Sequence, residues 1–223
     1  MDSPRRRNQP PHPWRNQIES VLISQQRLAR RVRTLAAQIQ RDFAGRDLVI
    51  VALLNGTVVL LADLLRGLSL PLRLDFIGVS SYGGGAESAD LVFTKELRLD
   101  VTGRDVLLVD DILDTGKTLS RVTSKLVRLR PRVIKVCVLL DKPARRLENI
   151  TAHYVGFTID NHFVVGYGLD YAERYRNLPF VGVLRPEMYK HPDFIPVLSP
   201  AKRRLLQGTE DKPPGGAAAE KPE

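Results

Sequence analysis

Three aspartates lie directly before a short glycine-containing turn in the stretch VLLVDDILDTGKTLSRV, residues 106–122. The GKT within it is similar to the end of a nucleotide-binding P-loop, but that motif requires a glycine five positions before Gly116, where this chain has Asp111. The run VLLV is typical of a strand, and the apolar residues after the turn recur at helical spacing: Leu119, Val122, Leu126 and Leu129. The stretch therefore predicts a strand, a turn and a helix, with the acids at the end of the strand.

The turn itself is suited to bind an anion. The first backbone N–H groups of a helix have no partners within the helix, and the helix dipole places positive charge there. Hydroxyl groups and a flexible glycine add to these donors in the run Thr115, Gly116, Lys117 and Thr118. Acids beside a phosphate would repel it unless they serve sugar hydroxyls, a divalent metal or a proton to be removed: Asp110, Asp111 and Asp114. This combination predicts a site for a sugar phosphate together with a metal.

Two other interpretations of the acids have to be weighed. An aspartate at a helix start is often only a cap, but that would account for Asp114 and leave Asp110 and Asp111 unexplained. The run VLLVDD also resembles the acidic pocket of response-regulator receiver domains. There the acidic pair lies near the N-terminus, whereas here nearly half of the chain precedes it, and the nearest later candidate for phosphorylation, Asp141, is followed by Lys-Pro. We therefore favour the sugar-phosphate site.

The rest of the chain alternates predicted strands and helices. A helix capped by Ser24 should end near Gly45, with an apolar face formed by Leu28, Val32, Leu35, Ile39 and Phe43. Another helix is expected over about 57–66, and strands are expected at 47–54, 72–81, 91–98, 133–140, 153–159 and 180–184. This order predicts an α/β fold with a mainly parallel twisted sheet flanked by helices. Ligands of such folds bind at the carboxyl ends of the strands.

Composition indicates one globular domain between two polar tails. The 223 residues are 43% hydrophobic and 26% charged, and no apolar run is long enough to cross a bilayer, so we expect a cytoplasmic protein without a membrane partner. The single cysteine, Cys137, excludes a disulfide framework and a cysteine zinc site. We expect disordered tails at 1–15 and 201–223 and one domain at 16–200. About +5 of the net charge of +9 lies between the tails, and this charge suits phosphate-rich small substrates as well as it suits RNA.

The motif VLLVDDILDTGKTL resembles the phosphoribosyl pyrophosphate signature of type I phosphoribosyltransferases. Further stretches are similar to the hypoxanthine-guanine branch of this family: LLNGT at 53–57, SSYG at 80–83, LLDKPARR at 139–146 and FVVGYGLDYAERYR at 163–176. Together the matches cover roughly residues 18–190. One branch of the family consists of RNA-binding regulators, and such a regulator remains the alternative interpretation.

The resemblance implies a purine salvage enzyme. Such an enzyme transfers the 5-phosphoribosyl group from phosphoribosyl pyrophosphate to N9 of hypoxanthine or guanine, which yields IMP or GMP and pyrophosphate. It uses Mg²⁺, has the type I phosphoribosyltransferase fold with a small hood from N- and C-terminal segments, and forms a homodimer or homotetramer. No nucleic-acid partner is expected.

The resemblance also implies a role for each matching residue. Asp110 and Asp111 would orient the ribose hydroxyls, and Asp114 would handle the proton at purine N7. The phosphate of the phosphoribosyl group would bind Thr115, Gly116, Lys117 and Thr118. Pyrophosphate would meet Asn55, Gly56, Ser81, Tyr82 and Arg176, with Asn55 replacing the lysine common in the family. The purine would contact Lys142, Phe163, Val164 and Asp170. Magnesium would be served by Asp170, with Asp110 and Asp111 acting directly or through water.

Overall fold

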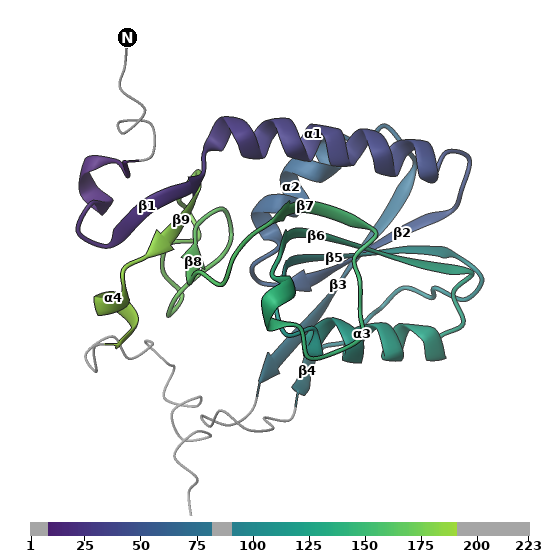
Figure 1. Cartoon of the computed structure of the whole chain (residues 1–223). Helices are drawn as coiled ribbons and strands as arrows, with labels where there is room; N and C mark the ends of the chain where they lie inside the picture. Colours follow the sequence, from purple (N-terminus) through teal and green to yellow (C-terminus); the bar gives the residue numbers. More distant parts are fainter. Residues whose placement is uncertain (1–8, 82–90, 191–223) are drawn as a thin grey trace, which may run out of the picture.

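The computed structural model describes residues 9–81 and 91–190. The expected tail at 201–223 and most of the glycine-rich stretch 81–90, including Tyr82, lie outside the described residues. Within the described part, the chain forms one large sheet covered by helices and a smaller sheet beside it (Figure 1).

The larger sheet has the strand order β4-β3-β2-β5-β6-β7. Strand β4 runs antiparallel to β3, and the other neighbouring strands are parallel. The mainly parallel α/β architecture predicted from the alternation of elements is therefore confirmed. The strands are β2 (Leu48–Leu54), β3 (Leu72–Ser81), β4 (Leu91–Lys95), β5 (Asp105–Leu113), β6 (Val133–Asp141) and β7 (Tyr154–Thr158).

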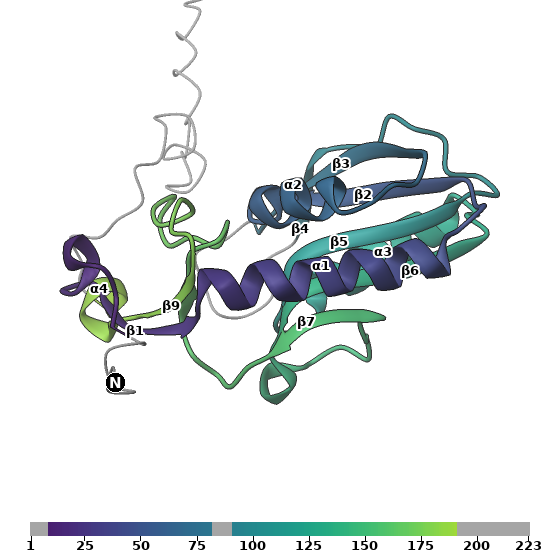
Figure 2. The same ribbon diagram turned by 90° about the horizontal axis from the view of Figure 1, so that it is seen from above.

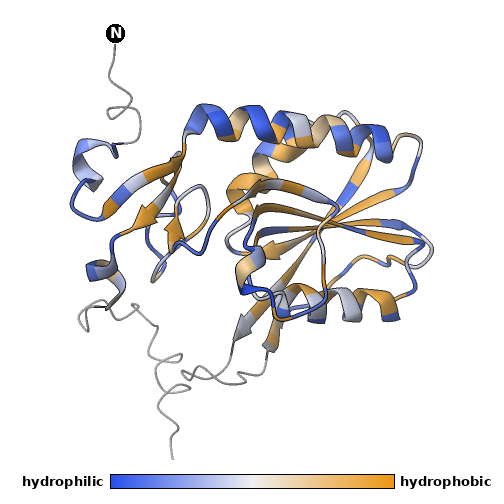
Figure 3. Cartoon of the chain, viewed as in Figure 1, coloured by the Kyte–Doolittle hydropathy of each residue, from blue (hydrophilic) through white to orange (hydrophobic). Residues whose placement is uncertain are grey.

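Helices cover both faces of this sheet, as Figures 1 and 2 show. Helices α1 (Gln25–Asp42) and α2 (Val58–Arg66) pack on one face, and α3 (Lys117–Arg128) packs on the other. Ser24 caps α1 as predicted, accepting a hydrogen bond from the Arg27 N–H at 3.4 Å. Figure 3 shows hydrophobic strands between helices whose outer faces are hydrophilic, which is the pattern of a sheet buried on both sides.

A smaller antiparallel sheet forms the hood that the family resemblance implied. It consists of β1 (Ile18–Ile23), β9 (Val181–Leu184) and β8 (Val164–Val165), in the order β1-β9-β8, and it has its own apolar core. The short helix α4 (Pro186–Lys190) follows β9. The hood therefore joins residues from both ends of the described chain, and sequence periodicity had predicted β9 but neither β1 nor the two-residue β8.

The structure differs from the expected disordered tail at residues 9–15. The 3-10 helix η1 (His12–Trp14) lies here, and Trp14 packs edge-on against Tyr175 with ring centroids 5.9 Å apart. Burial of this large ring against the hood core offsets the entropy of ordering the segment. The composition of the segment had pointed the other way because its three prolines and one arginine outnumber its large apolar residues.

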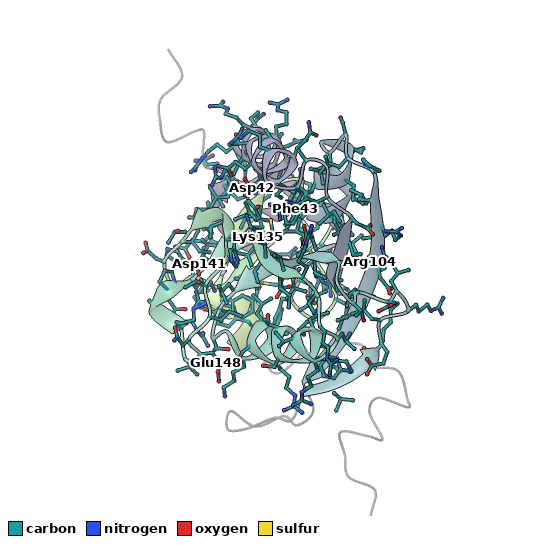
Figure 4. All side chains as sticks on the ribbon, turned by 90° about the vertical axis from the view of Figure 1, so that its right-hand side faces the viewer. Asp42, Phe43, Arg104, Lys135, Asp141 and Glu148 are labelled. Atoms are coloured by element: carbon teal, nitrogen blue, oxygen red, sulfur yellow. The ribbon has the colours of Figure 1, made fainter. Side chains whose placement is uncertain are left out.

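The amino ends of the parallel strands are tied to the helix layer by polar contacts. Asp42, at the end of α1, accepts hydrogen bonds from Lys135 Nζ at 2.9 Å and from the Tyr154 hydroxyl at 2.6 Å. Figure 4 shows Asp42, Phe43 and Lys135 grouped at this end of the molecule. Since Lys135 lies on β6 and Tyr154 on β7, these bonds fix the C-terminus of α1 to the sheet. Among the described residues, no helix is both long and apolar enough to cross a membrane.

Strand β4 ends at Lys95, although the sequence predicted a strand over 91–98. The backbone N–H groups of Arg98 and Leu99 donate to Asp75 Oδ2 at 2.5 and 2.9 Å, so they are not available for a strand ladder. Lys95 Nζ donates to Asp75 Oδ1 at 2.9 Å. Burial raises the pKa of Asp75, but the hydrogen bonds outweigh it and lower the pKa to about 2.

We expect Asp75→Asn to reduce the free energy of unfolding by about 2 kcal/mol at pH 7, because one pKa unit corresponds to about 1.4 kcal/mol. A carboxyl whose pKa is depressed on folding stabilises the protein above its unfolded pKa of 3.8, and this stabilisation is lost as the pH falls toward about 2. The difference between wild type and variant should therefore narrow below pH 4, as measured by urea unfolding. Glu19→Gln, on the exposed side of β1, serves as the control. An equal difference at pH 7 and pH 3 would contradict the expectation.

Candidate active site

The predicted acids lie at the carboxyl end of β5, at the centre of the large sheet. Asp110 pairs in register with Val138 of β6 and is 8% exposed, and Asp111 follows it in the strand. The Asp111 N–H donates to Asp110 Oδ1 at 2.9 Å. Burial raises the pKa of Asp110 well above its usual value, and the neighbouring charge of Asp111 raises it further. Burial also raises the pKa of Asp111, against the hydrogen bond to Asp110 and the charge of Arg176. Such a buried pair favours a bound group that compensates its negative charge, such as a hydroxyl donor or a cation.

The turn after these acids has the geometry of an anion cradle. Gly116 is the N-cap of α3 with a φ of +87°, and a Cβ at this position would lie 2.8 Å from Ile150 Cγ2. The cap residue has no side chain to bond the first amides of α3. The Lys117 N–H approaches Thr115 Oγ1 at 3.5 Å. The amino end of the helix thus faces the acids with donors available for an anion.

Asp114 does not cap α3, so the capping interpretation is wrong. Its Oδ1 atom lies 2.9 Å from Arg145 Nε, in an ion pair across the mouth of the site. Arg145 belongs to η2 (Pro143–Arg145), which directly follows Lys142 at the end of β6. A carboxylate held by an exposed arginine is free to exchange that partner for a ligand.

The segment after β2 lies against the acidic pair. A Cβ on Gly56 would lie 1.6 Å from Asp111 Oδ2, so only glycine allows this approach. Gly168 crosses the same segment, since its Cβ would lie 2.1 Å from the Gly56 carbonyl oxygen. Arg176 Nη1 donates to the Gly168 carbonyl oxygen at 2.9 Å, and Arg176 Nη2 lies 2.9 Å from Asp170 Oδ1. The hood therefore delivers Asp170 and Arg176 to the acids of β5.

One cavity of about 290 Å³ collects most of the residues predicted to bind the phosphoribosyl and pyrophosphate groups. These are Asn55, Gly56, Asp110, Asp111, Asp114, Thr115, Gly116, Thr118, Asp170 and Arg176. The exposed side chain of Lys117 lines a different cavity along α3 instead. Ser81 ends β3, and Tyr82 lies outside the described residues. The structure thus brings together all but three of the predicted residues on this side of the site.

A second cavity, of about 610 Å³, adjoins the first and contains all the predicted purine residues. These are Lys142, Phe163, Val164 and Asp170, and the cavity shares Asp111, Ile112, Asp114 and Asp170 with the first. Lys142 is 6% exposed and its Nζ donates to the His162 carbonyl oxygen at 2.6 Å. Burial lowers the pKa of Lys142, while the charge of Asp114 opposes this shift. Phe163, by contrast, is 40% exposed.

Several other residues of the two cavities were not predicted from the sequence, among them Ile112, Arg145, Leu169 and Tyr189. Ile112 could have been found, because it lies between the predicted acids. Arg145 and Tyr189 had no local signal, since an arginine beside Lys-Pro and a tyrosine near the end of a short helix are ordinary surface residues. Their place in the site depends on contacts between distant segments.

The acids of the first cavity are suitable ligands for Mg²⁺, although they do not form a complete metal cage. Within residues 9–81 and 91–190, no group of three or more histidine, cysteine, aspartate or glutamate side chains is arranged to hold a metal ion. Mg²⁺ is commonly bound by one or two carboxylates together with substrate phosphates and water. Asp110, Asp111 and Asp170 supply such oxygens in one cavity, and a cation there would relieve the charge of the buried pair. The residues present therefore fit a magnesium ion that arrives with a phosphate ligand.

Comparison with known proteins agrees with this geometry. Residues 20–172 match the family model described as "Phosphoribosyl transferase domain". The chain is 45% identical over 175 residues to the bifunctional protein TilS/HprT of Listeria monocytogenes, covering 78% of this chain but only 27% of that protein. It is 41% identical over 177 residues to the hypoxanthine-guanine phosphoribosyltransferase of Streptococcus pneumoniae, covering 79% of this chain and 98% of the relative.

A solved structure supports the same assignment. The hypoxanthine phosphoribosyltransferase of Staphylococcus aureus superimposes with a TM-score of 0.78 at 40% identity, covering 81% of this chain and 99% of that one. The resemblance inferred from the sequence motifs is therefore confirmed. The chain belongs to the phosphoribosyl transferase domain family, within its hypoxanthine-guanine phosphoribosyltransferase branch.

Proposed function

We propose that the two adjoining cavities bind phosphoribosyl pyrophosphate and hypoxanthine or guanine. The 5-phosphoribosyl group moves to N9 of the purine and pyrophosphate leaves, which makes IMP or GMP in purine salvage. The observation that carries the proposal is that both cavities are lined by Asp111, Asp114 and Asp170. A ribose bound above these acids has the leaving group on one side and the purine on the other.

The first cavity would hold the phosphoribosyl group. The 5-phosphate would accept hydrogen bonds from the amides and hydroxyls of Thr115–Thr118, where Gly116 begins α3. Asp110 and Asp111 would accept hydrogen bonds from the ribose hydroxyls. Arg176 and the backbone beside Asn55 and Gly56 would face pyrophosphate, with the main chain of this segment acting in place of the side-chain charge that a lysine provides.

The second cavity would select a 6-oxopurine. Lys142 has three N–H donors and no acceptor, so it can keep its bond to the His162 carbonyl and still donate to an exocyclic oxygen. It cannot accept a hydrogen bond from the amino group of adenine. Phe163 would stack on the purine ring, and the main chain of Val164 would contact the base edge.

The acids would then act on the charge that develops during transfer. Breaking the bond from C1′ to pyrophosphate leaves positive charge on the ribose, which the Asp110–Asp111 pair of the same cavity would stabilise. Asp114, which lines both cavities, would accept the proton from purine N7 as N9 attacks. Magnesium bound with pyrophosphate would reduce the negative charge of the leaving group. Asp170 would hold that ion, with Asp110 and Asp111 acting directly or through water.

We propose that the enzyme acts in the cytoplasm as a homodimer or homotetramer and requires no nucleic-acid partner. A regulator that binds RNA would have no use for a cavity lined by Lys142 and Phe163, and this is why we favour the enzyme.

The direct test is to incubate the protein with phosphoribosyl pyrophosphate, Mg²⁺ and one nucleobase at a time, and to identify the nucleotide by mass spectrometry. IMP and GMP are expected from hypoxanthine and guanine, and adenine should give no AMP. Absence of product with every nucleobase would overturn the proposed function.

Lys142→Ala should raise the KM for hypoxanthine by roughly 10- to 100-fold, the range expected when a hydrogen bond from a charged group is lost. The KM for phosphoribosyl pyrophosphate should change much less, because Lys142 lines only the second of the two cavities. Lys125→Ala, in the separate cavity along α3, is the control and should leave both values unchanged. If both substrates weaken equally in Lys142→Ala, the lysine has a structural role.

A further inference from the structure

Three aromatic rings meet at the edge of the second cavity. Phe163 and Tyr189 are stacked, with centroids 4.6 Å apart and planes 15° from parallel. Tyr171 lies edge-on to both, with centroids 5.6 Å from Phe163 and 6.5 Å from Tyr189. The Tyr171 hydroxyl also donates to the Tyr189 carbonyl oxygen at 3.4 Å. Since stacked rings at this spacing are in direct contact, no base fits between Phe163 and Tyr189.

Tyr189 approaches Phe163 from the hood. It lies on α4, directly after β9, and together with Tyr171 it packs against the apolar core of the hood. Ile112, another wall of the same cavity, packs instead against the core of the large sheet. Figures 1 and 2 show α4 beside the hood strands. The cavity therefore has a hood wall formed by Tyr189 and a sheet wall formed by Ile112.

Phe163 keeps an open surface despite this stacking. It is 40% exposed while one of its faces lies against Tyr189, and it lines the cavity together with Ile112 and Lys142. It lies between β7 and β8, and its backbone carbonyl accepts a hydrogen bond from the Leu184 N–H of β9 at 2.8 Å, which holds the main chain but not the ring. An exposed phenylalanine in such a connection has rotational freedom that a stacked partner removes.

We propose that Tyr189 is a positioning residue for purine binding, which acts by supporting the hood-facing surface of Phe163. The purine then forms the third layer of a stack, on the face of Phe163 opposite Tyr189, with Ile112 on its far side. This inference rests on the proposed function, because it takes Phe163 as the ring that stacks on the base. The hydroxyl of Tyr189 plays no part, since the contact is between ring faces.

The test compares steady-state kinetics of the full chain carrying Tyr189→Phe or Tyr189→Leu. Tyr189→Leu should raise the KM for hypoxanthine roughly three- to tenfold, the equivalent of one aromatic stacking contact, with a smaller effect on the KM for phosphoribosyl pyrophosphate. Tyr189→Phe keeps the stack and should behave as wild type. Met188→Ala, which removes a neighbouring contact of α4 with the hood core, controls for general loosening of the hood and should leave the hypoxanthine KM unchanged.

The outcomes separate this inference from the proposed function. If the wild type forms no IMP, the proposed function fails. If the wild type is active and Tyr189→Leu lowers the hypoxanthine KM, the tyrosine covers the base site instead of supporting it, and the inference is overturned. An unchanged KM, or equal changes for both substrates, also overturns it. Should Tyr189→Leu fail to fold by its melting curve, Tyr189→Met provides the same comparison with a flexible apolar side chain.

Discussion

Asp114→Asn should lower the single-turnover rate by roughly 10²- to 10⁴-fold, the range typical of a lost general acid–base group. Asparagine has nearly the same size as aspartate but cannot accept a proton. We propose Asp114 as the acceptor of that proton because, like Asp111 and Asp170, it borders both cavities, and its other contact is the exchangeable ion pair with Arg145 at 2.9 Å. Binding of phosphoribosyl pyrophosphate should persist, since Asp110 and Asp111 remain.

The two properties are measured separately. Calorimetry gives the affinity for phosphoribosyl pyrophosphate, and rapid-quench measurements with enzyme in excess give the rate of the chemical step. Asp100→Asn makes the same chemical change at an exposed position before the amino end of β5 and should leave both unchanged. A near-wild-type rate in Asp114→Asn would show that this carboxylate is not the base and serves only its ion pair with Arg145.

Gly56→Ala should reduce kcat/KM for phosphoribosyl pyrophosphate by roughly 10²-fold, because displacement of a site group by about 1 Å can have an effect of this size. The added Cβ would lie 1.6 Å from Asp111 Oδ2 and 2.7 Å from Asp111 Cγ. Neither atom can stay where it is, so the carboxylate must turn or the segment after β2 must move. Either response disturbs the cavity predicted to hold ribose and pyrophosphate.

The control for Gly56→Ala is Gly103→Ala. Gly103 has open space around it but a φ of +67°, so alanine there strains the backbone without touching the site. It should lower the melting temperature and leave kcat/KM unchanged. Gly56→Ala should instead lower kcat/KM, with a smaller effect on the melting temperature. If Gly56→Ala binds phosphoribosyl pyrophosphate with wild-type affinity, the close approach of this glycine to Asp111 has no role in substrate binding.

Much of the architecture was predictable from local patterns. The apolar spacing of α1 and its Ser24 cap, the buried strand β2, and the strand-turn-helix unit around Gly116 all agree with the structure. Each depends on residues within a few positions of one another, so periodicity and capping preferences report them directly. The purine residues that the family resemblance implied also meet in one cavity, where Lys142 follows the parallel strand β6 and Phe163, Val164 and Asp170 come from the hood.

The errors of prediction arose where distant residues decide local structure. Strand β4 stops at Lys95 because Asp75, on another strand, accepts the N–H groups of Arg98 and Leu99. Residues 9–15 are ordered because the Trp14 ring packs edge-on against Tyr175. The side chain of Lys117 lines another cavity, so its expected role in phosphate binding stays a prediction about its backbone N–H.

The sequence by itself therefore determined the fold class, the position of the acidic strand end and the family of the chain. The tertiary structure alone decided that Gly56 lies against Asp111, that Arg145 pairs with Asp114, and that Tyr189 stacks on Phe163. The physical reason is the distance along the chain over which each kind of interaction acts. Periodicity, capping and turn chemistry act between near neighbours in the chain, whereas these three contacts join residues far apart in the sequence, two of them within the large sheet and the third within the hood.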